Sequence, residues 1–153
     1  MTDEKKLEYQ ESIKYGAQRE LRAMLIFMEQ GYAVSVPNMS ARYDFIAEKY
    51  PEILRVQVKN LIQKKKKTEN RTNSYDVWCV RPWSVANGQR RGYTIDDCDL
   101  VVGISYDSKN RTTDFAIVPV DEVAGNATEY RLSEHDNSKG KEFLNSYAAL
   151  EQR

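Results

Sequence analysis

The sequence has few of the residues that build metal clusters or disulfide frameworks, since it contains two cysteines and one histidine. Cys79 and Cys98 stand apart without the spacing of zinc ligands, and two cysteines in 153 residues do not indicate a disulfide scaffold. We expect both to be buried, reduced thiols. His135 lies in a polar stretch and is assigned no role. Without a Cys/His ligand set, a nucleophile elbow or a glycine-rich phosphate loop, nothing supports zinc, serine-hydrolase or kinase chemistry.

Long apolar runs are also missing from the sequence. No stretch approaches the ~20 residues that span a bilayer, and the N-terminus, Met-Thr-Asp-Glu-Lys-Lys, lacks a signal-peptide core. The composition, 41% hydrophobic and 30% charged, is ordinary for a soluble globular protein. Neither a repeat nor a linker divides the chain. We expect one cytoplasmic domain over residues 1–153, long enough to bury a core.

Neither sign of charge dominates, because 23 Lys and Arg residues balance 23 Asp and Glu residues. The basic residues nevertheless gather in the middle of the chain, at Lys64, Lys65, Lys66, Lys67, Arg71, Arg81, Arg90 and Arg91. A run of lysines is often only a solvated, self-repelling loop. A neutral chain with a cationic middle can still bind a polyanion locally, so these residues are candidates for contacts to DNA phosphates.

Hydrophobic periodicity and turn residues predict the order of the elements. A helix over 5–30 precedes a short strand, 32–36, and a hairpin with strands 43–47 and 53–58. A second, longer hairpin, 56–67 and 72–82, forms a basic ribbon of a shape that fits the major groove. An exposed basic loop, 84–93, two buried strands, 97–105 and 115–120, a helical turn, 121–123, an irregular stretch, 124–137, and a last helix, 139–151, complete the chain.

The first helix carries an apolar stripe with one carboxylate on it. The stripe consists of Ile13, Gly16, Ala17, Leu21, Met24, Leu25, Phe27 and Met28, and Gly31 ends the helix. At 100° per residue, Glu20 lies about 40° from Met24. A carboxylate among core-facing residues needs a partner or a metal. The alternative is that Glu20 borders the stripe and pairs with a base such as Arg19.

The first hairpin brings three more polar side chains together. Side chains two apart on a strand share a face, so Gln57 and Lys59 point the same way, while Val56 and Val58 point into the opposite layer. Asp44, on the partner strand, can lie opposite them. An acid, an amide and an ammonium group beside apolar neighbours form a costly cluster, which favours a functional role.

Hydrolysis of a phosphodiester is a reaction that such a cluster could catalyse. A divalent metal held by oxygen ligands activates water and neutralises charge on phosphorus. Asp44 is a hard donor suited to Mg²⁺, and the Gln57 amide oxygen and the Val58 main-chain carbonyl could add two ligands. Glu20 could bind the metal directly or through water. Lys59 could orient the attacking water or offset charge in the transition state.

These residues resemble the PD-(D/E)XK nuclease family. The resemblance rests on a helical Glu followed by Asp and, 13 residues later, Gln-x-Lys; it assigns catalytic roles to Glu20, Asp44, Gln57 and Lys59. It covers roughly residues 8–120. It implies an α/β (α+β) fold with a restriction-endonuclease-like core, in which a central mixed β-sheet is flanked by an N-terminal and a C-terminal helix and carries an extended basic β-ribbon.

The chain departs from the family pattern at two positions. Tyr43 precedes Asp44 where the family usually has Pro, and Gln57 replaces the usual Asp or Glu. Three explanations of Gln57 stay open: an active site that uses the amide oxygen, with Glu20 restoring the charge; an inactive nuclease that only binds DNA; or a deliberate inactivating change.

Within the family, the Tyr-Asp…Val-Gln-Val-Lys motif, the length and the basic ribbon are most similar to the small homing endonucleases of cyanobacterial group I introns. That similarity implies a prokaryotic, magnesium-dependent enzyme that makes a double-strand break in DNA at a long pseudo-palindromic site. Two copies at least are required to cut both strands of a symmetric site, and the resemblance makes a tetramer plausible. Two alternatives are a Holliday-junction resolvase-like nuclease and a catalytically inactive DNA-binding module.

Overall fold

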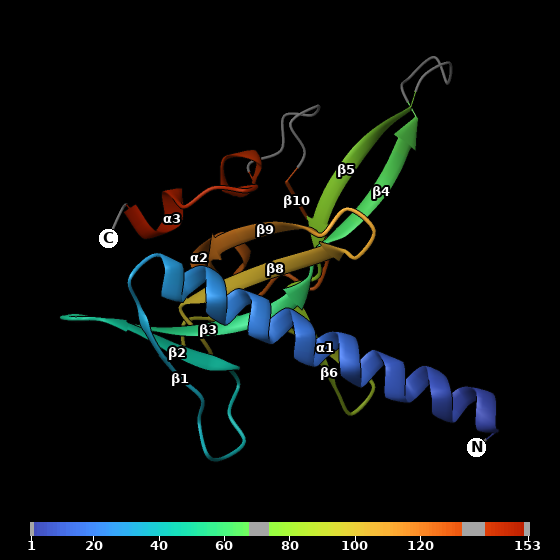
Figure 1. The fold of residues 1–153 in the computed structure, drawn as a ribbon, viewed down its shortest axis with the longest axis horizontal. Helices are drawn as coiled ribbons and strands as arrows, with labels where there is room; N and C mark the ends of the chain where they lie inside the picture. The colour runs from blue at the N-terminus through green and yellow to red at the C-terminus, as the bar shows by residue number, and fades with distance from the viewer. Residues whose placement is uncertain (1, 68–73, 133–139, 152–153) are drawn as a thin grey trace.

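The computed structural model describes residues 2–67, 74–132 and 140–151 (Figure 1). Their helices and strands follow one another as α1 (Asp3–Glu29), β1 (Ala33–Ser35), β2 (Phe45–Lys49), β3 (Glu52–Asn60), β4 (Ile62–Lys67), β5 (Ser74–Val80), β6 (Trp83–Ala86), β7 (Gln89–Gly92), β8 (Leu100–Asp107), β9 (Thr112–Pro119), α2 (Val120–Val123), β10 (Tyr130–Arg131), a 3-10 turn η1 (Lys141–Phe143) and α3 (Ala148–Glu151). Arg71, a predicted DNA-binding residue, and His135 lie outside the described residues.

The centre of the fold is a mixed sheet with strand order β1-β2-β3-β8-β9. β3 and β8 run parallel, whereas the other neighbours are antiparallel. The predicted hairpin around residue 50 is the β2–β3 pair, and the two predicted buried strands are β8 and β9. The mixed sheet with flanking helices confirms the predicted fold class.

Helix α1 crosses one face of this sheet and contacts β1, β2, β3 and β8 (Figure 1). Its buried side chains are Ala23, Ile26 and Phe27, and the Phe27 ring packs edge-to-face against Tyr32 and Phe45, with centroids 5.6 and 5.5 Å away. The predicted stripe is therefore partly wrong, because Ile13, Leu21, Leu25 and Met28 are exposed. Apolar side chains occur on more than one face of the helix, and the sheet covers the face that contains Phe27.

Strands β4 and β5 form the predicted ribbon, which extends away from the main sheet (Figure 1). The ribbon is not a direct continuation of β3, because the strand is interrupted at Leu61. The Leu61 N–H donates to the Ile104 carbonyl at 3.0 Å. A Cβ atom on Gly103 would lie 2.5 Å from Val80 Cγ1 and 3.3 Å from Leu61 Cβ. Glycine at this position lets the base of the ribbon pack against β8. β10 pairs with β5 and widens the ribbon at its base.

Two predicted segments differ from the structure. The segment 84–93 is a hairpin of β6 and β7 rather than a loop, with Asn87 and Gly88 at φ values of 52° and 75° in its turn. The predicted helix 139–151 is divided into η1 and α3. The helix is interrupted because Asn145, at φ 49°, bonds to β9. Its side chain accepts a hydrogen bond from the Phe115 N–H at 2.9 Å and donates one to Asp114 at 3.0 Å.

Cys79 and Cys98 are buried free thiols, as expected. Burial raises the pKa of the Cys98 thiol to about 12, so this thiol stays protonated at neutral pH. Within the described part of the chain, no helix has both the length and the apolar character needed to cross a membrane.

Candidate active site

Asp44 is fixed against β3 just before β2 begins. Its N–H donates to the Val56 carbonyl at 2.8 Å, and its carboxylate Oδ2 accepts from the Val58 N–H at 2.7 Å. Main-chain groups of one strand therefore fix both the backbone and the side chain of Asp44. Because these partners are main-chain atoms, the hairpin alone is sufficient to orient the carboxylate.

The carboxyl group of Glu20, on α1, forms a hydrogen bond with that of Asp44. Burial raises the pKa of Glu20, and the charge of Asp44 and the hydrogen bond raise it further. Burial also raises the pKa of Asp44, although the Val58 N–H, the bond to Glu20 and the charge of Lys59 oppose the increase. Glu20 therefore lies on a partly buried side of the helix and interacts with Asp44, while the charge of Arg19 opposes the increase in its pKa.

Gln57 and Lys59 lie beside this acid pair on β3. Val56 and Val58 are buried, whereas Gln57 and Lys59 are half-buried, as the predicted alternation requires. The Gln57 amide donates to the Val58 carbonyl at 3.2 Å. The Lys59 ammonium donates to the Trp83 carbonyl at 2.9 Å and lies 5.1 Å from the centroid of the Tyr93 ring. The structure thus brings Glu20, Asp44 and Lys59 together, and Gln57 lies two residues before Lys59 on the same strand.

A buried ion pair beneath the site was not predicted. Asp97 is 4% exposed and accepts from Arg42 Nε at 3.0 Å, from the Thr94 N–H at 3.0 Å and from Arg91 at 3.4 Å. Arg42 also donates to the Ser84 hydroxyl at 2.8 Å. Arg42 lies two residues before Asp44, so this network ties the loop that leads to Asp44 to the β6–β7 hairpin. The sequence feature that could have indicated this ion pair is an acidic residue, Asp97, at the start of the predicted apolar strand 97–105.

Replacing Asp97 with asparagine should lower the free energy of unfolding at neutral pH by about 2 kcal/mol, a typical value for hydrogen bonds to a charged group. Burial alone would raise the pKa of Asp97, but the bonds and charges of Arg42, Thr94 N–H and Arg91 outweigh it and lower the pKa. A lowered folded-state pKa stabilises the fold above the unfolded value of about 3.9, and this contribution is lost as the pH falls through the folded-state pKa.

Chemical denaturation between pH 2.5 and 8 measures this difference. The gap between the wild type and Asp97→Asn should be constant near neutrality and shrink below about pH 4. Asp96→Asn is the matched control, because the Asp96 side chain is exposed. A gap that widens in acid would contradict the assigned ion pair.

The predicted DNA-binding residues differ in their surroundings. Lys64 and Arg81 both pair with Glu129, a residue that the sequence did not single out; the Arg81 contact measures 3.4 Å. Arg90 stacks over the Trp83 ring at 4.5 Å from its centroid, and Arg91 pairs with Asp97. Lys65 is exposed. Lys66 and Lys67 belong to β4, but their side chains are not among those described.

Two adjoining cavities extend from Lys59 along this basic surface. The first, of about 270 Å³, is lined by Lys59, Asn60, Ile62, Arg81 and Trp83. The second, of about 480 Å³, is lined by Arg81, Trp83, Arg90, Thr128, Glu129 and Arg131. Both are lined by Arg81 and Trp83, so the two cavities are neighbours, and their charged lining is mainly positive; we refer to them together as the basic groove.

A long helix that places Glu20 near Asp44 and Lys59 of a hairpin in a mixed sheet is typical of nucleases with a restriction-endonuclease-like core. The family model described as PD-(D/E)XK endonuclease matches residues 11–150, so the chain belongs to that family. No curated protein matches the sequence. Among solved structures, the chain is similar to a bacterial homing endonuclease, I-Ssp6803I, with a TM-score of 0.63 and 21% identity over 90% of each chain. At this identity, the similarity shows a shared fold.

Nucleases of this family generally use divalent metals, and the donors present here fit such an ion. Two carboxyl groups share a hydrogen bond and have raised pKa values, so a cation would relieve their repulsion. Over the residues described, no group of three or more His, Cys, Asp or Glu side chains is placed to hold a metal. Gln57 and the Val58 carbonyl offer neutral oxygens on the strand next to Asp44.

Proposed function

We propose that the protein is a homing endonuclease that makes a Mg²⁺-dependent double-strand break in DNA at a long pseudo-palindromic site. The observation that carries this proposal is the hydrogen-bonded pair of Glu20 and Asp44 next to Lys59. Membership of the endonuclease family supports the reaction class. The assignment as a homing endonuclease is supported by the similarity of fold to such an enzyme and by the basic ribbon. The resemblance of the sequence to intron-encoded homing endonucleases supports it as well.

Each site residue has a role that its contacts support. Asp44, Glu20, the Gln57 amide oxygen and the Val58 carbonyl would hold the metal, which supplies charge neutralisation at phosphorus and an activated water. Lys59 donates one of its three N–H groups to the Trp83 carbonyl, so two remain for a water or a phosphate oxygen. The Val58 N–H keeps the Asp44 carboxylate oriented.

DNA binding would use the groove and the ribbon. Arg81 and Arg90 line the groove that starts at Lys59, and Lys64, Lys65, Lys66 and Lys67 lie on the neighbouring strand β4. Arg91 and Arg71 belong to the same proposed set. Glu129 is the counter-ion of Lys64 and Arg81 in the free protein. A DNA phosphate would compete with this carboxylate for the same two cations, so Glu129 would lower the affinity for DNA of arbitrary sequence.

The proposed reaction also requires more than one copy of the chain. One candidate active site lies in each copy, and a break in both strands of a symmetric target needs two sites related by the symmetry of that target. We propose a homodimer as the smallest active form, and a tetramer as the larger assembly in which two ribbons reach more distant half-sites.

Incubation of the protein with Mg²⁺ and a mixture of random-sequence duplexes and fragmented bacterial genomic DNA, followed by sequencing of the cut ends, tests the proposal. We expect paired cuts that share one long, pseudo-palindromic sequence and that disappear when a chelator is added. A four-way junction without that sequence should remain intact. Cutting of junctions regardless of sequence would indicate a resolvase, and failure to cut any DNA with Mg²⁺ would contradict the endonuclease proposal.

A further inference from the structure

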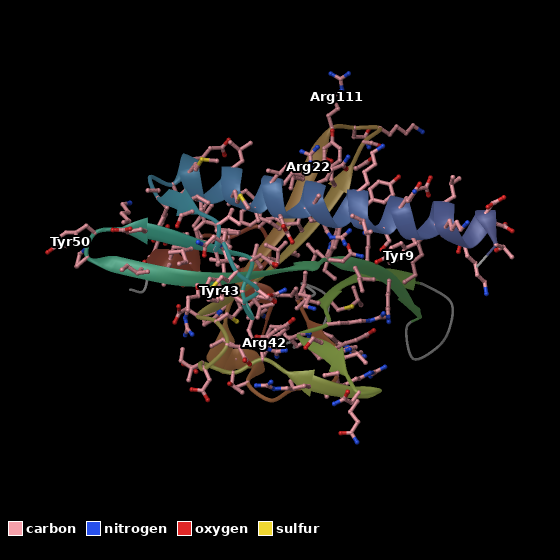
Figure 2. The ribbon with its side chains drawn as sticks, turned by 90° about the horizontal axis from the view of Figure 1, so that it is seen from below. Tyr9, Arg22, Arg42, Tyr43, Tyr50 and Arg111 are labelled. Carbon is pink, nitrogen blue, oxygen red and sulfur yellow. The ribbon has the colours of Figure 1, made fainter. Side chains whose placement is uncertain are left out.

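A separate cavity of about 340 Å³ lies between α1 and the distal part of β8. This volume is at the lower end of the ~300–1,000 Å³ typical of ligand sites. Its polar lining includes Lys14, Arg19 and Arg22 from the helix, Asn60 from the end of β3, and Ser105 and Ser108. Figure 2 shows Arg22 on α1 beside the hairpin of β8 and β9, whose tip carries Arg111. The sequence did not predict a ligand site here, and of these residues it named only Arg19, as a possible partner of Glu20.

Arg22 is held in place but lacks an acceptor for one of its N–H groups. Its Cζ atom lies 3.3 Å from the centroid of the Tyr106 ring. Its Nε atom is buried, and none of the described residues accepts a hydrogen bond from it. A buried N–H without a partner is costly, and native structures rarely retain one without a ligand or water. Arg22 thus lines the cavity and carries one N–H group that no described residue satisfies.

The charge of the lining also points to an anion. Three cationic side chains line the cavity, and no carboxylate is among the described residues that do so. The basic groove differs, because a carboxylate, Glu129, is part of its lining and pairs with Arg81. Arginine forks and serine hydroxyls together are suited to a tetrahedral oxyanion.

We propose that this cavity binds a phosphate group. The phosphate belongs to the DNA strand next to the scissile bond, an assignment that rests on the proposed endonuclease function. Arg19 and Asn60 are the chain neighbours of Glu20 and Lys59. Asn60 also lines the cavity that contains Lys59 and Arg81. A strand that crosses the active site can therefore place one phosphate here and the following phosphates in the basic groove.

Thermal unfolding of the free protein in chelator, with inorganic phosphate or with chloride at equal ionic strength, tests the cavity without DNA. Phosphate should raise the Tm of the wild type, and Arg22→Gln should weaken the apparent phosphate affinity at least tenfold. Lys14→Gln, at an exposed position, should weaken it less and provides a second variant should Arg22→Gln not fold. Lys5→Gln is the matched control, because it removes one charge from the same helix away from the cavity and should retain the wild-type response.

Binding of a non-cleaved duplex in chelator at several salt concentrations identifies the source of the phosphate. Loss of one phosphate contact should reduce the slope of log K against log salt by about 0.9 in Arg22→Gln. An unchanged slope together with a lost phosphate response would assign the cavity to free phosphate or a nucleotide and overturn the DNA assignment. A wild type that cleaves DNA but gains no stability from phosphate would overturn only the proposal that the cavity binds phosphate. A phosphate response without any Mg²⁺-dependent cleavage would overturn the endonuclease function alone.

Discussion

Asp44→Asn should reduce DNA cleavage by at least about 1,000-fold, because it removes a carboxylate that contributes several kcal/mol of charge stabilisation in a metal-assisted reaction. The substitution is nearly isosteric, and the asparagine oxygen can still accept the hydrogen bond of 2.7 Å from the Val58 N–H. The fold should therefore persist while the reaction is lost. Single-turnover cleavage of a duplex that contains the target, with enzyme in excess, measures the effect on chemistry apart from DNA binding.

Stability measurements with the same variant separate a metal ligand from a structural acid. The pKa values of Glu20 and Asp44 are raised in the folded state, so ionising the pair costs stability as the pH rises above the unfolded values. In chelator at pH 7–8, Asp44→Asn should thus be at least as stable as the wild type. Mg²⁺ at 100 times its Kd should stabilise only the wild type, by about 2.7 kcal/mol. Equal stabilisation of both proteins would remove Asp44 from the proposed metal site.

The sequence predicted the candidate site because its geometry is mostly local. Asp44, Gln57 and Lys59 belong to one hairpin, in which strand alternation decides the direction of each side chain. Glu20 required one further inference, that the helix packs with that side toward the sheet. The position of Glu20 was right although Leu21 and Leu25 were wrongly assigned to the same buried stripe. Periodicity alone could not decide which of several apolar lines the sheet would cover.

The parts that the sequence did not predict depend mainly on contacts between distant segments. Arg42 meets Asp97 across 55 positions, and Lys64 meets Glu129 across 65. The break in the C-terminal helix depends on Asn145 reaching β9, where Phe115 and Asp114 offer partners. The β6–β7 hairpin is different, because the Asn87-Gly88 pair in its turn is a strong local signal for a hairpin. The polar and basic residues that follow, Gln89, Arg90 and Arg91, favoured an exposed loop instead.

Lys59→Met should lower the single-turnover rate of cleavage by about 10²–10³, the usual cost of losing one donor that stabilises transition-state charge. Methionine keeps most of the aliphatic stem that packs near Tyr93, so the loss is chiefly that of the ammonium group. DNA affinity should decrease much less than the rate, because one cation among many in the groove makes a small contribution to binding.

Lys65→Met is the matched control for this prediction, since Lys65 is an exposed lysine on the nearby ribbon. It should alter DNA affinity and its salt dependence but leave the rate at saturating enzyme nearly unchanged. The Tm of Lys59→Met shows whether the bond to the Trp83 carbonyl, at 2.9 Å, is needed for the fold. If both lysine variants cleave at the wild-type rate, Lys59 only anchors the β6–β7 hairpin, and another group must assist the attack on phosphorus.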